Sequence, residues 1–99
     1  MTRRLELPIG LLISQSGSYD AVSRAIHAGA VLAIEEINAS ADRSVAIAPV
    51  SIDPAGRLSG YVDGARVMLQ DHGLKHVMGC YTSSSRKEVL PLFEKADAL

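Results

Sequence analysis

The 99-residue sequence lacks several features that would point to a particular class of protein. It contains a single cysteine, so no disulfide can form within the chain and the redox compartment stays open. Its 10 basic and 11 acidic residues nearly cancel, which gives no electrostatic case for direct binding of nucleic acid or an anionic membrane. No apolar run approaches the ~20 residues of a membrane span, so we expect no membrane insertion. The hydrophobic content of 47% is enough for the core of one small domain, or part of one.

Motifs of common enzymes and cofactor-binding proteins are also missing. The apolar segment "PIGLL" is not followed by G-x-G-x-x-G, and neither G-x-x-x-x-G-K-[ST] nor G-x-S-x-G occurs. His27, His72 and His76 lie apart without the spacing of metal ligands. Cys80 stands next to an apolar run and has no motif relation to a histidine, which favours an inert core thiol over a nucleophile. We therefore expect no enzyme, no cofactor and no metal.

Three apolar segments alternate with three segments of helical pattern. Strands are predicted over residues 9–13, 45–53 and 74–81, and helices over 20–38, 59–72 and 83–96. The inward face of the first helix is predicted from Ile26, Ala30, Ala33 and Ile37, and that of the second from Val62, Ala65 and Leu69. Ser59 is the expected N-cap of the second helix and Gly73 its left-handed stop, while Pro91 should kink or interrupt the third helix.

This alternation predicts an α/β fold with a doubly wound parallel sheet, like one Rossmann-like or flavodoxin-like lobe. Pro49 cannot donate a ladder hydrogen bond, so the second strand should lie at an edge and the strand order should be 2-1-3. In that order the chain leaves the first and third strands in opposite directions, and the crevice between their carboxyl ends is where such folds bind ligands. Residues 14–18 and 81–85 should therefore lie side by side.

Four consecutive hydroxyl residues, Thr82 to Ser85, fall at the predicted start of the third helix. The first turn of a helix exposes unpaired N–H groups and a partial positive charge. With Ser83 or Ser84 as N-cap, this turn would suit a small ligand that carries a carbonyl or carboxylate oxygen. The alternative is that one serine caps the helix and the others are solvated, with Tyr81 packed at the strand end. The spacing of the residues leaves both interpretations open.

Two segments resemble a known family. "IGLLISQSGSYDAVSRAIHAGAVLAIEEIN" is similar to the opening of type I periplasmic-binding-protein domains, with a strand, an S-x-[ST]-G loop and a long helix. "GCYTSSSRKEVLPLFEKADAL" is more specific, since it resembles the G-C-[YW]-x-S-x-x-R-K-x-V-x-P segment of the amide and urea branch. That branch holds urea-transport binding proteins and the amide-sensing negative regulator of amidase operons. Tyr81 in place of tryptophan and the "EKADAL" ending favour the amide sensor.

The resemblance implies a binding protein for a small amide or urea. Ser83 stands where the family serine contacts the ligand amide through its hydroxyl and backbone N–H, and Tyr81, Ser84 and Ser16 are the neighbouring candidates. An amide sensor would act on an antitermination regulator, whereas a transport component would act on an ABC permease. A third reading, a freestanding flavodoxin-like interaction domain, remains open, although a phosphoacceptor site would need acids where Ser14 and Cys80 stand.

Members of this family are two-lobed and several times longer, so the resemblance makes residues 1–99 the N-terminal portion of the first lobe. The outer edge of the third strand would then be unpaired, and a homo-oligomer formed through that edge is possible. The start of the sequence shows no apolar segment typical of a signal peptide. On that basis the expected location is cytoplasmic, with the periplasm as the alternative if a signal was removed.

Overall fold

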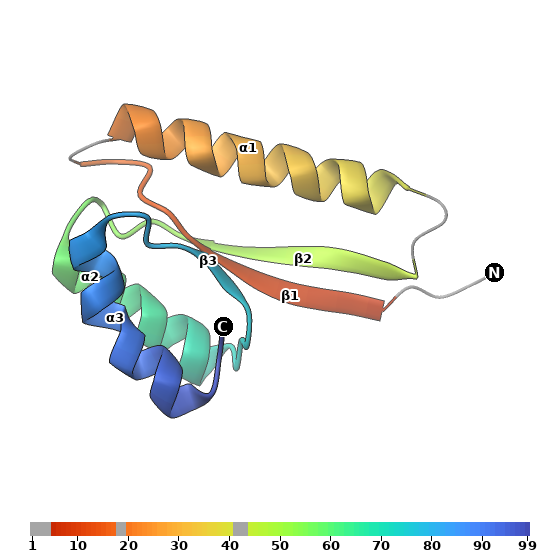
Figure 1. Ribbon diagram of the computed structural model, residues 1–99. Helices are drawn as coiled ribbons and strands as arrows, with labels where there is room; N and C mark the ends of the chain where they lie inside the picture. The colour runs from red at the N-terminus through yellow and green to blue at the C-terminus, as the bar shows by residue number, and fades with distance from the viewer. Residues whose placement is uncertain (1–4, 18–19, 41–43) are drawn as a thin grey trace.

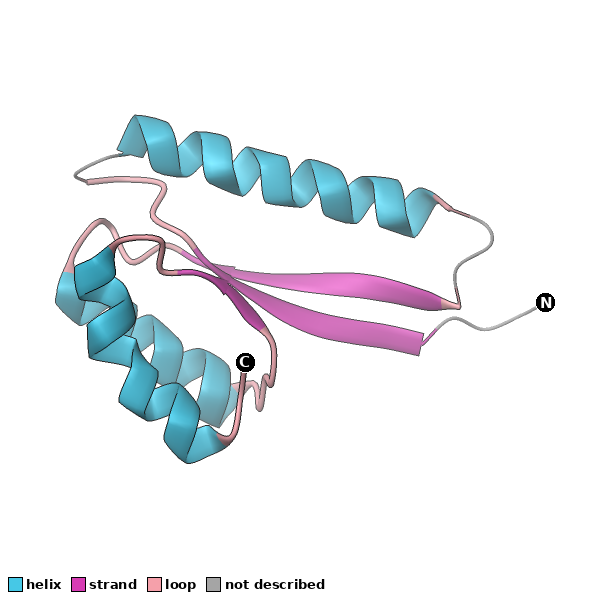
Figure 2. Ribbon diagram, viewed as in Figure 1, coloured by secondary structure: helices cyan, strands magenta, loops and turns pink. Residues whose placement is uncertain are grey.

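The computed structural model describes residues 5–17, 20–40 and 44–99 of the chain (Figure 1). Strands and helices alternate along the sequence, as the hydrophobic pattern predicts (Figure 2). The strands are β1 (Leu5–Leu12), β2 (Val45–Ile52) and β3 (Val77–Gly79); the helices are α1 (Asp20–Ala39), α2 (Leu58–Arg66) with the π-helical turn η1 (Val67–Asp71), and α3 (Ser83–Ala96).

The three strands form one parallel sheet in the order β2-β1-β3, which confirms the predicted fold class and strand order. β1 pairs with β2 along its whole length, from Leu5 opposite Val45 to Leu12 opposite Ile52. Its pairing with β3 is much shorter and begins at Gly10, opposite Val77. Pro49 is exposed on β2, the edge strand, where its missing N–H costs no ladder bond.

Helices cover both faces of the sheet, with α1 on one face and α2 and α3 together on the other (Figure 1). Successive side chains of β1 point to opposite faces, so its buried end contributes to two cores. Leu11 and Ile13 pack with Ile34 of α1, whereas Leu12 belongs to the cluster beneath α2 and α3. This is the two-sided burial that the apolar run of the first strand predicts.

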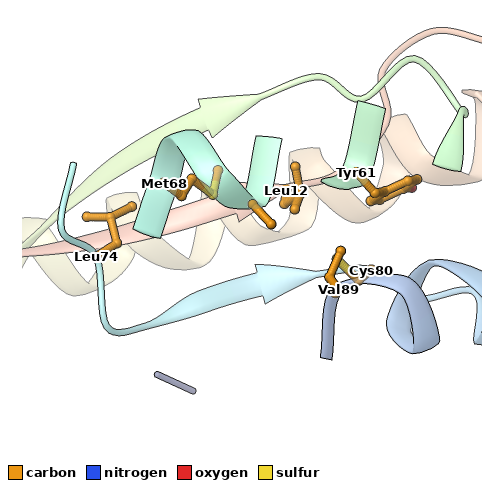
Figure 3. Packing of buried hydrophobic residues seen from close by; sticks show 7 residues of the cluster. Leu12, Tyr61, Met68, Leu74, Cys80 and Val89 are labelled. Carbon is orange, nitrogen blue, oxygen red and sulfur yellow. The ribbon is translucent and has the colours of Figure 1, made fainter. Parts of the chain in front are cut away.

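The larger core joins residues from every element on the α2 and α3 side (Figure 3). Leu12 lies at its centre, with Met68 and Tyr61 from the helix above it and Cys80 and Val89 from the other side (Figure 3). Each of these side chains is at least nine-tenths buried. Because Leu12 and Cys80 end their strands next to one another, this core also fixes the crevice at the carboxyl end of the sheet.

The faces of α1 and α2 differ in part from the sequence prediction. In α1, Ile26 and Ala33 are exposed, while Ser23 and Ile34 are the buried residues. The prediction holds for Ala30, which packs against the core that contains Ile34, and for Ile37, which is half-buried, but not for Ile26 and Ala33. The inward face includes a serine, which an apolar pattern does not mark. In α2 the buried residues are Tyr61, Gly64 and Ala65, followed by Met68 in η1, and Val62 and Leu69 are only half-buried.

The predicted start of the second helix and the predicted effect of Pro91 on the third also need correction. Ser59 does not cap α2, which begins one residue earlier with Arg57 at the cap position. Gly73 does adopt the left-handed conformation (φ +62°) that ends this helical segment, as predicted. α3 continues through Pro91 without interruption to Ala96. More than two turns into α3, Pro91 has no backbone N–H to donate to the carbonyl four residues earlier, so the packing of the helix has to compensate for that hydrogen bond.

β3 is shorter than the predicted strand over residues 74–81. Leu74 is buried in the core, and the strand ends at Gly79 because Gly79 and Cys80 both adopt positive φ, +131° and +54°. On the outer side of β3, the Leu99 N–H donates to the Lys75 carbonyl (2.8 Å) and the Val77 N–H donates to the Leu99 carbonyl (2.8 Å). This is the bonding pattern of a further parallel strand, so the outer edge of β3 is paired at its first residues.

Candidate functional site

A small polar cavity lies where the carboxyl ends of β1 and β3 meet. Its volume is about 100 Å³, and it lies between the first turns of α1, α2 and α3. It is lined by Ser23, Gly56, Leu58, Tyr61, Tyr81, Thr82 and Ser84. Five of these residues carry hydroxyl groups and none carries a formal charge at neutral pH, so we call this cavity the hydroxyl pocket. It occupies the position at which parallel sheets of this order bind ligands.

A buried hydrogen-bond network forms one wall of the hydroxyl pocket. The Ser14 hydroxyl, at the end of β1, lies 2.9 Å from the phenol oxygen of Tyr61 and accepts the Gly56 N–H at 3.0 Å. Ser14 and Tyr61 are 1% and 4% exposed, so the network is held away from solvent. Since buried polar groups are costly unless they are hydrogen-bonded, these three residues fix the start of α2 relative to β1.

Tyr81 forms the opposite wall, and the backbone before it sets its direction. The Cys80 N–H donates to the Leu12 carbonyl at 3.2 Å, which is the last bond between β3 and β1. Cys80 then turns the chain with a positive φ that costs a non-glycine residue about 1–2 kcal/mol. After this turn the phenol oxygen of Tyr81 lies 3.3 Å from the hydroxyl of Ser23 on α1, which donates to it.

The hydroxyl run begins α3, but its cap is Thr82 and not Ser83 or Ser84 as predicted. The Thr82 hydroxyl accepts the Ser85 N–H at 3.3 Å, and the Ser85 hydroxyl donates to the Thr82 carbonyl at 2.9 Å. Ser85 is fully buried, so this pair is the structural part of the run. Ser83 and Ser84 are exposed at the first two positions of the helix.

Because Thr82 performs the capping, Ser83 and Ser84 remain available to a ligand. Within residues 5–17, 20–40 and 44–99, neither of their hydroxyls forms a hydrogen bond, and their N–H groups are among those that a helix leaves unpaired. Ser84 faces the hydroxyl pocket together with Tyr81. Ser83 instead borders an apolar groove of about 410 Å³ that follows α3 past Val89 and Phe93. The serine run therefore adjoins two hollows of different character.

Ser16 lies apart from these residues, in contact with the loop after β2. Its hydroxyl donates to one carboxylate oxygen of Asp53 at 2.7 Å, while the other accepts the N–H groups of Gln15 (2.8 Å) and Ala55 (2.9 Å). Burial would raise the pKa of the Asp53 carboxyl, but the N–H of Gln15, the hydroxyl of Ser16 and the N–H groups of Ala55 and Ser16 together lower it below the usual value. Asp53 thus ties the loop after β1 to the loop after β2.

The expected proximity of residues 14–18 and 81–85 holds for the strand ends themselves. Tyr81 lines the hydroxyl pocket directly, and Ser14 contributes to its opposite side through its hydrogen bond with Tyr61. Residues 15–17 turn toward Asp53 and Ala55, and residue 18 lies outside the described residues. Ser16 is therefore not brought next to Tyr81, Ser83 and Ser84, and its predicted role in ligand binding would require a ligand that extends to this loop.

In the part of the chain that the structure describes, the cysteine, histidine and acidic residues gather into no metal-binding cluster. Burial raises the pKa of the Cys80 thiol to about 11, which keeps it protonated and agrees with the expected core thiol. Among the described residues, no helix combines the length and the hydropathy that a membrane crossing needs.

Comparison with known proteins identifies the family. Residues 7–99 match the model of the periplasmic binding protein domain, which is almost the whole chain. The chain belongs to this family. The description of this family is that of a binding domain and names no catalytic activity.

Solved structures of this family share the fold of the chain. A possible leucine/isoleucine/valine-binding protein from Rhodopirellula baltica superimposes with a TM-score of 0.88 at 14% identity, over 99% of this chain and 27% of that one. A branched-chain amino acid transporter substrate-binding protein from Streptococcus pneumoniae, in complex with isoleucine, gives 0.81 at 23% identity, over 97% and 27%. A leucine-binding protein from Thermotoga maritima gives 0.82 at 16%, over 93% and 26%. The chain thus spans about a quarter of the length of these proteins.

Several residues of the hydroxyl pocket were missed by the sequence analysis. Ser23 falls on the inward face of α1, four residues before His27 and eleven before the buried Ile34. A serine on an apolar helix face is a signal that could have been noticed. Tyr61 could have been found from its spacing of four residues before the predicted inward Ala65. Asp53 is the last residue of the predicted strand over 45–53, but its three partners come from loops whose conformation the sequence does not specify.

Proposed function

We propose that the chain forms part of the substrate-binding component of an ABC transporter and takes a small polar ligand at the hydroxyl pocket. The observation that carries the proposal is the position of this pocket at the carboxyl ends of β1 and β3, beside unpaired donors of Ser83 and Ser84. Membership of the periplasmic binding protein family supports the binding role. The partner would be an ABC permease, and the place of action the periplasm.

The ligand we favour is a short aliphatic amide or urea. None of the described residues that line the pocket is charged, so none can neutralise a carboxylate or an ammonium group, and desolvating either without a partner is costly. Its volume of about 100 Å³ accommodates only a small head group. Hydroxyl and N–H donors suit a carbonyl oxygen, and hydroxyl oxygens accept from an NH₂ group. The similarity of residues 79–91 to the amide and urea branch points the same way.

Isothermal titration of the full-length protein with acetamide, butyramide, urea and leucine tests this choice. We expect acetamide, butyramide or urea to bind at least tenfold more tightly than leucine, because leucine has to bury two charges. Tight binding of leucine with no measurable heat from the amides or urea would assign the protein to branched-chain amino acids, as for the Streptococcus pneumoniae relative. The absence of heat from all four compounds would refute the proposed function.

An amide sensor that controls an amidase operon is the second candidate. It rests on the segment "GCYTSSSRKEVLP", in which Tyr81 replaces the tryptophan found in part of the branch. A sensor would change its affinity for an antitermination regulator when the amide binds, and it would act in the cytoplasm. Fractionation of the native cells distinguishes the two, since recovery with the periplasmic proteins excludes the sensor and recovery with the cytoplasmic proteins excludes the transport component.

Replacing Ser83 by alanine should weaken ligand binding by roughly ten- to a hundredfold, or about 1–3 kcal/mol. The exposed Ser83 hydroxyl has no partner among the described residues and borders the apolar groove along α3. The proposal is that the ligand reaches from the hydroxyl pocket to this first turn of α3, so the substitution removes a ligand contact and leaves the helix cap intact. Titration with the best ligand of the panel measures the change, and a thermal melt of the same variant should be within about 1 °C of the wild type.

Ser85→Ala is the matched control for this measurement. The Ser85 hydroxyl is buried and bonded to Thr82, so its removal should lower stability by about 1 kcal/mol and leave ligand contacts in place. The two variants should thus give opposite results, with affinity lost in one and thermal stability in the other. Equal affinity of Ser83→Ala and the wild type would return Ser83 to the interpretation of a solvated helix residue.

A further inference from the structure

The hydroxyl pocket contains one buried contact that the proposed ligand does not explain. Ser23 is 1% exposed on the inward face of α1, yet its side chain is polar. Its hydroxyl donates to the phenol oxygen of Tyr81 at 3.3 Å, across 58 positions of sequence. Tyr81 itself is 37% exposed and lines the pocket, so the contact joins a fixed residue to one that a ligand can reach.

We propose that Ser23 is a positioning residue that orients the phenol of Tyr81, so that its O–H points into the hydroxyl pocket as a donor to the ligand. This proposal rests on the ligand site given above. A phenol oxygen that accepts from Ser23 still has its own hydrogen to donate. Since Ser23 lies on the α1 side, that hydrogen is directed toward the other lining groups and the bound molecule.

The backbone supports this role of Ser23. Gly79 and Cys80 turn the chain sharply, and the turn sends the Tyr81 ring from the end of β3 toward α1. The turn fixes where the ring begins but leaves the rotation of the hydroxyl about the C–O bond free. A single buried donor at the far end of the ring removes that freedom. The wall formed by Tyr61 has the same construction, because the hydroxyl of Ser14 lies 2.9 Å from its phenol oxygen.

Each phenol of the pocket is thus held by a serine from a different element. Ser14 lies two residues after the end of β1 and is 1% exposed, like Ser23, and each serine hydroxyl contacts the phenol oxygen of its tyrosine. The phenol of Tyr81 accepts from Ser23 and keeps its own hydrogen to donate, which favours a ligand group that accepts a hydrogen bond at that point, such as an amide or urea oxygen. The arrangement would therefore contribute to specificity for the carbonyl end of the ligand.

A double-mutant cycle in the full-length protein tests the coupling, with acetamide as the probe. Ser23→Ala should weaken binding about three- to tenfold, the usual effect of one hydrogen bond, and should do nothing further in a Tyr81→Phe background. Thioacetamide, a poorer acceptor, should lose less affinity than acetamide in both variants. Alanine is a better helix former than serine, so α1 should persist, and Ser59→Ala on the exposed face of α2 serves as the control.

A readout that needs no ligand separates this inference from the proposed function. With 3-fluorotyrosine placed at position 81, Ser23→Ala should shift or broaden its fluorine resonance, whereas Ser59→Ala should leave it unchanged. An unchanged resonance in Ser23→Ala would overturn the positioning role. A changed resonance with additive affinity losses would overturn the link to the ligand. Wild-type protein that does not bind acetamide refutes the proposed ligand, and the resonance alone then decides whether Ser23 orients Tyr81.

Discussion

Gly79→Ala should destabilise the fold by about 3–5 kcal/mol and abolish ligand binding. Gly79 has φ +131°, a conformation that costs a residue with a side chain about 1–3 kcal/mol. A Cβ at this position would stand 2.1 Å from the carbonyl oxygen of Leu12, which is backbone and has no room to move. That oxygen also accepts the Cys80 N–H, so relieving the overlap breaks the last bond between β1 and β3.

Gly29→Ala is the matched control for this substitution. Gly29 lies on the exposed side of α1, and a Cβ built there meets no atom within 4 Å. Alanine should stabilise the helix by up to ~1 kcal/mol because it loses less conformational freedom than glycine. Denaturant unfolding of both variants measures the contrast. If Gly79→Ala unfolds within 1 kcal/mol of the wild type by the same measurement, the turn at the end of β3 cannot have the described geometry.

The consequence for function follows from the position of Gly79. The turn that it makes with Cys80 directs Tyr81 toward Ser23 and sets the distance from β3 to the first residues of α3. A shifted turn would move one wall of the hydroxyl pocket relative to the wall held by Ser14 and Tyr61. Misplacement of donors by about 1 Å is enough to weaken hydrogen bonds strongly, so affinity should be lost even in molecules that remain folded.

The sequence was sufficient to predict the parallel sheet and the order of its strands. The apolar run before Ser14 and the proline at position 49 determined which strand is central and which lies at the edge, and both predictions are confirmed. An apolar run of this kind is a reliable indicator of a central strand, because a parallel strand buried on both faces tolerates few residue types. The start and end of α3 were also predicted at the residues where they occur.

The details of the site required the structure. The N-cap of α3 is the residue whose backbone is extended just before the helix, and this residue is Thr82. Threonine and serine are both good N-cap residues, so the sequence alone does not distinguish Thr82 from Ser83. The pairs Ser23–Tyr81 and Ser14–Tyr61 join residues 58 and 47 positions apart, which local patterns do not encode. In α1, an inward serine interrupts the apolar pattern, and Ile26 was wrongly assigned to the buried face. Ser23, the polar residue that obscured the inward face of α1 in the sequence, is also one of the residues that line the hydroxyl pocket.

Leu12→Ala should destabilise the protein by about 2–5 kcal/mol, because it removes the residue that connects β1 to both helices of its face. Leu12 is fully buried and shares a core with Tyr61, Met68 and Val89, from α2, η1 and α3 (Figure 3). The loss has two parts, the apolar surface returned to water on unfolding and the cavity that rigid neighbours leave unfilled.

Leu32→Ala makes the same chemical change on the outer side of α1, where the leucine is 58% exposed, and it should alter stability by no more than about 0.5 kcal/mol. Urea unfolding of the two variants, with unchanged m-values, gives the comparison. Ligand affinity of folded Leu12→Ala should fall as well, since Tyr61 rests against Leu12 and the phenol of Tyr61 lines the pocket. Equal losses of stability in the two variants would show that Leu12 is not at the centre of this core, and full affinity in folded Leu12→Ala would show that the core does not hold the pocket wall in place.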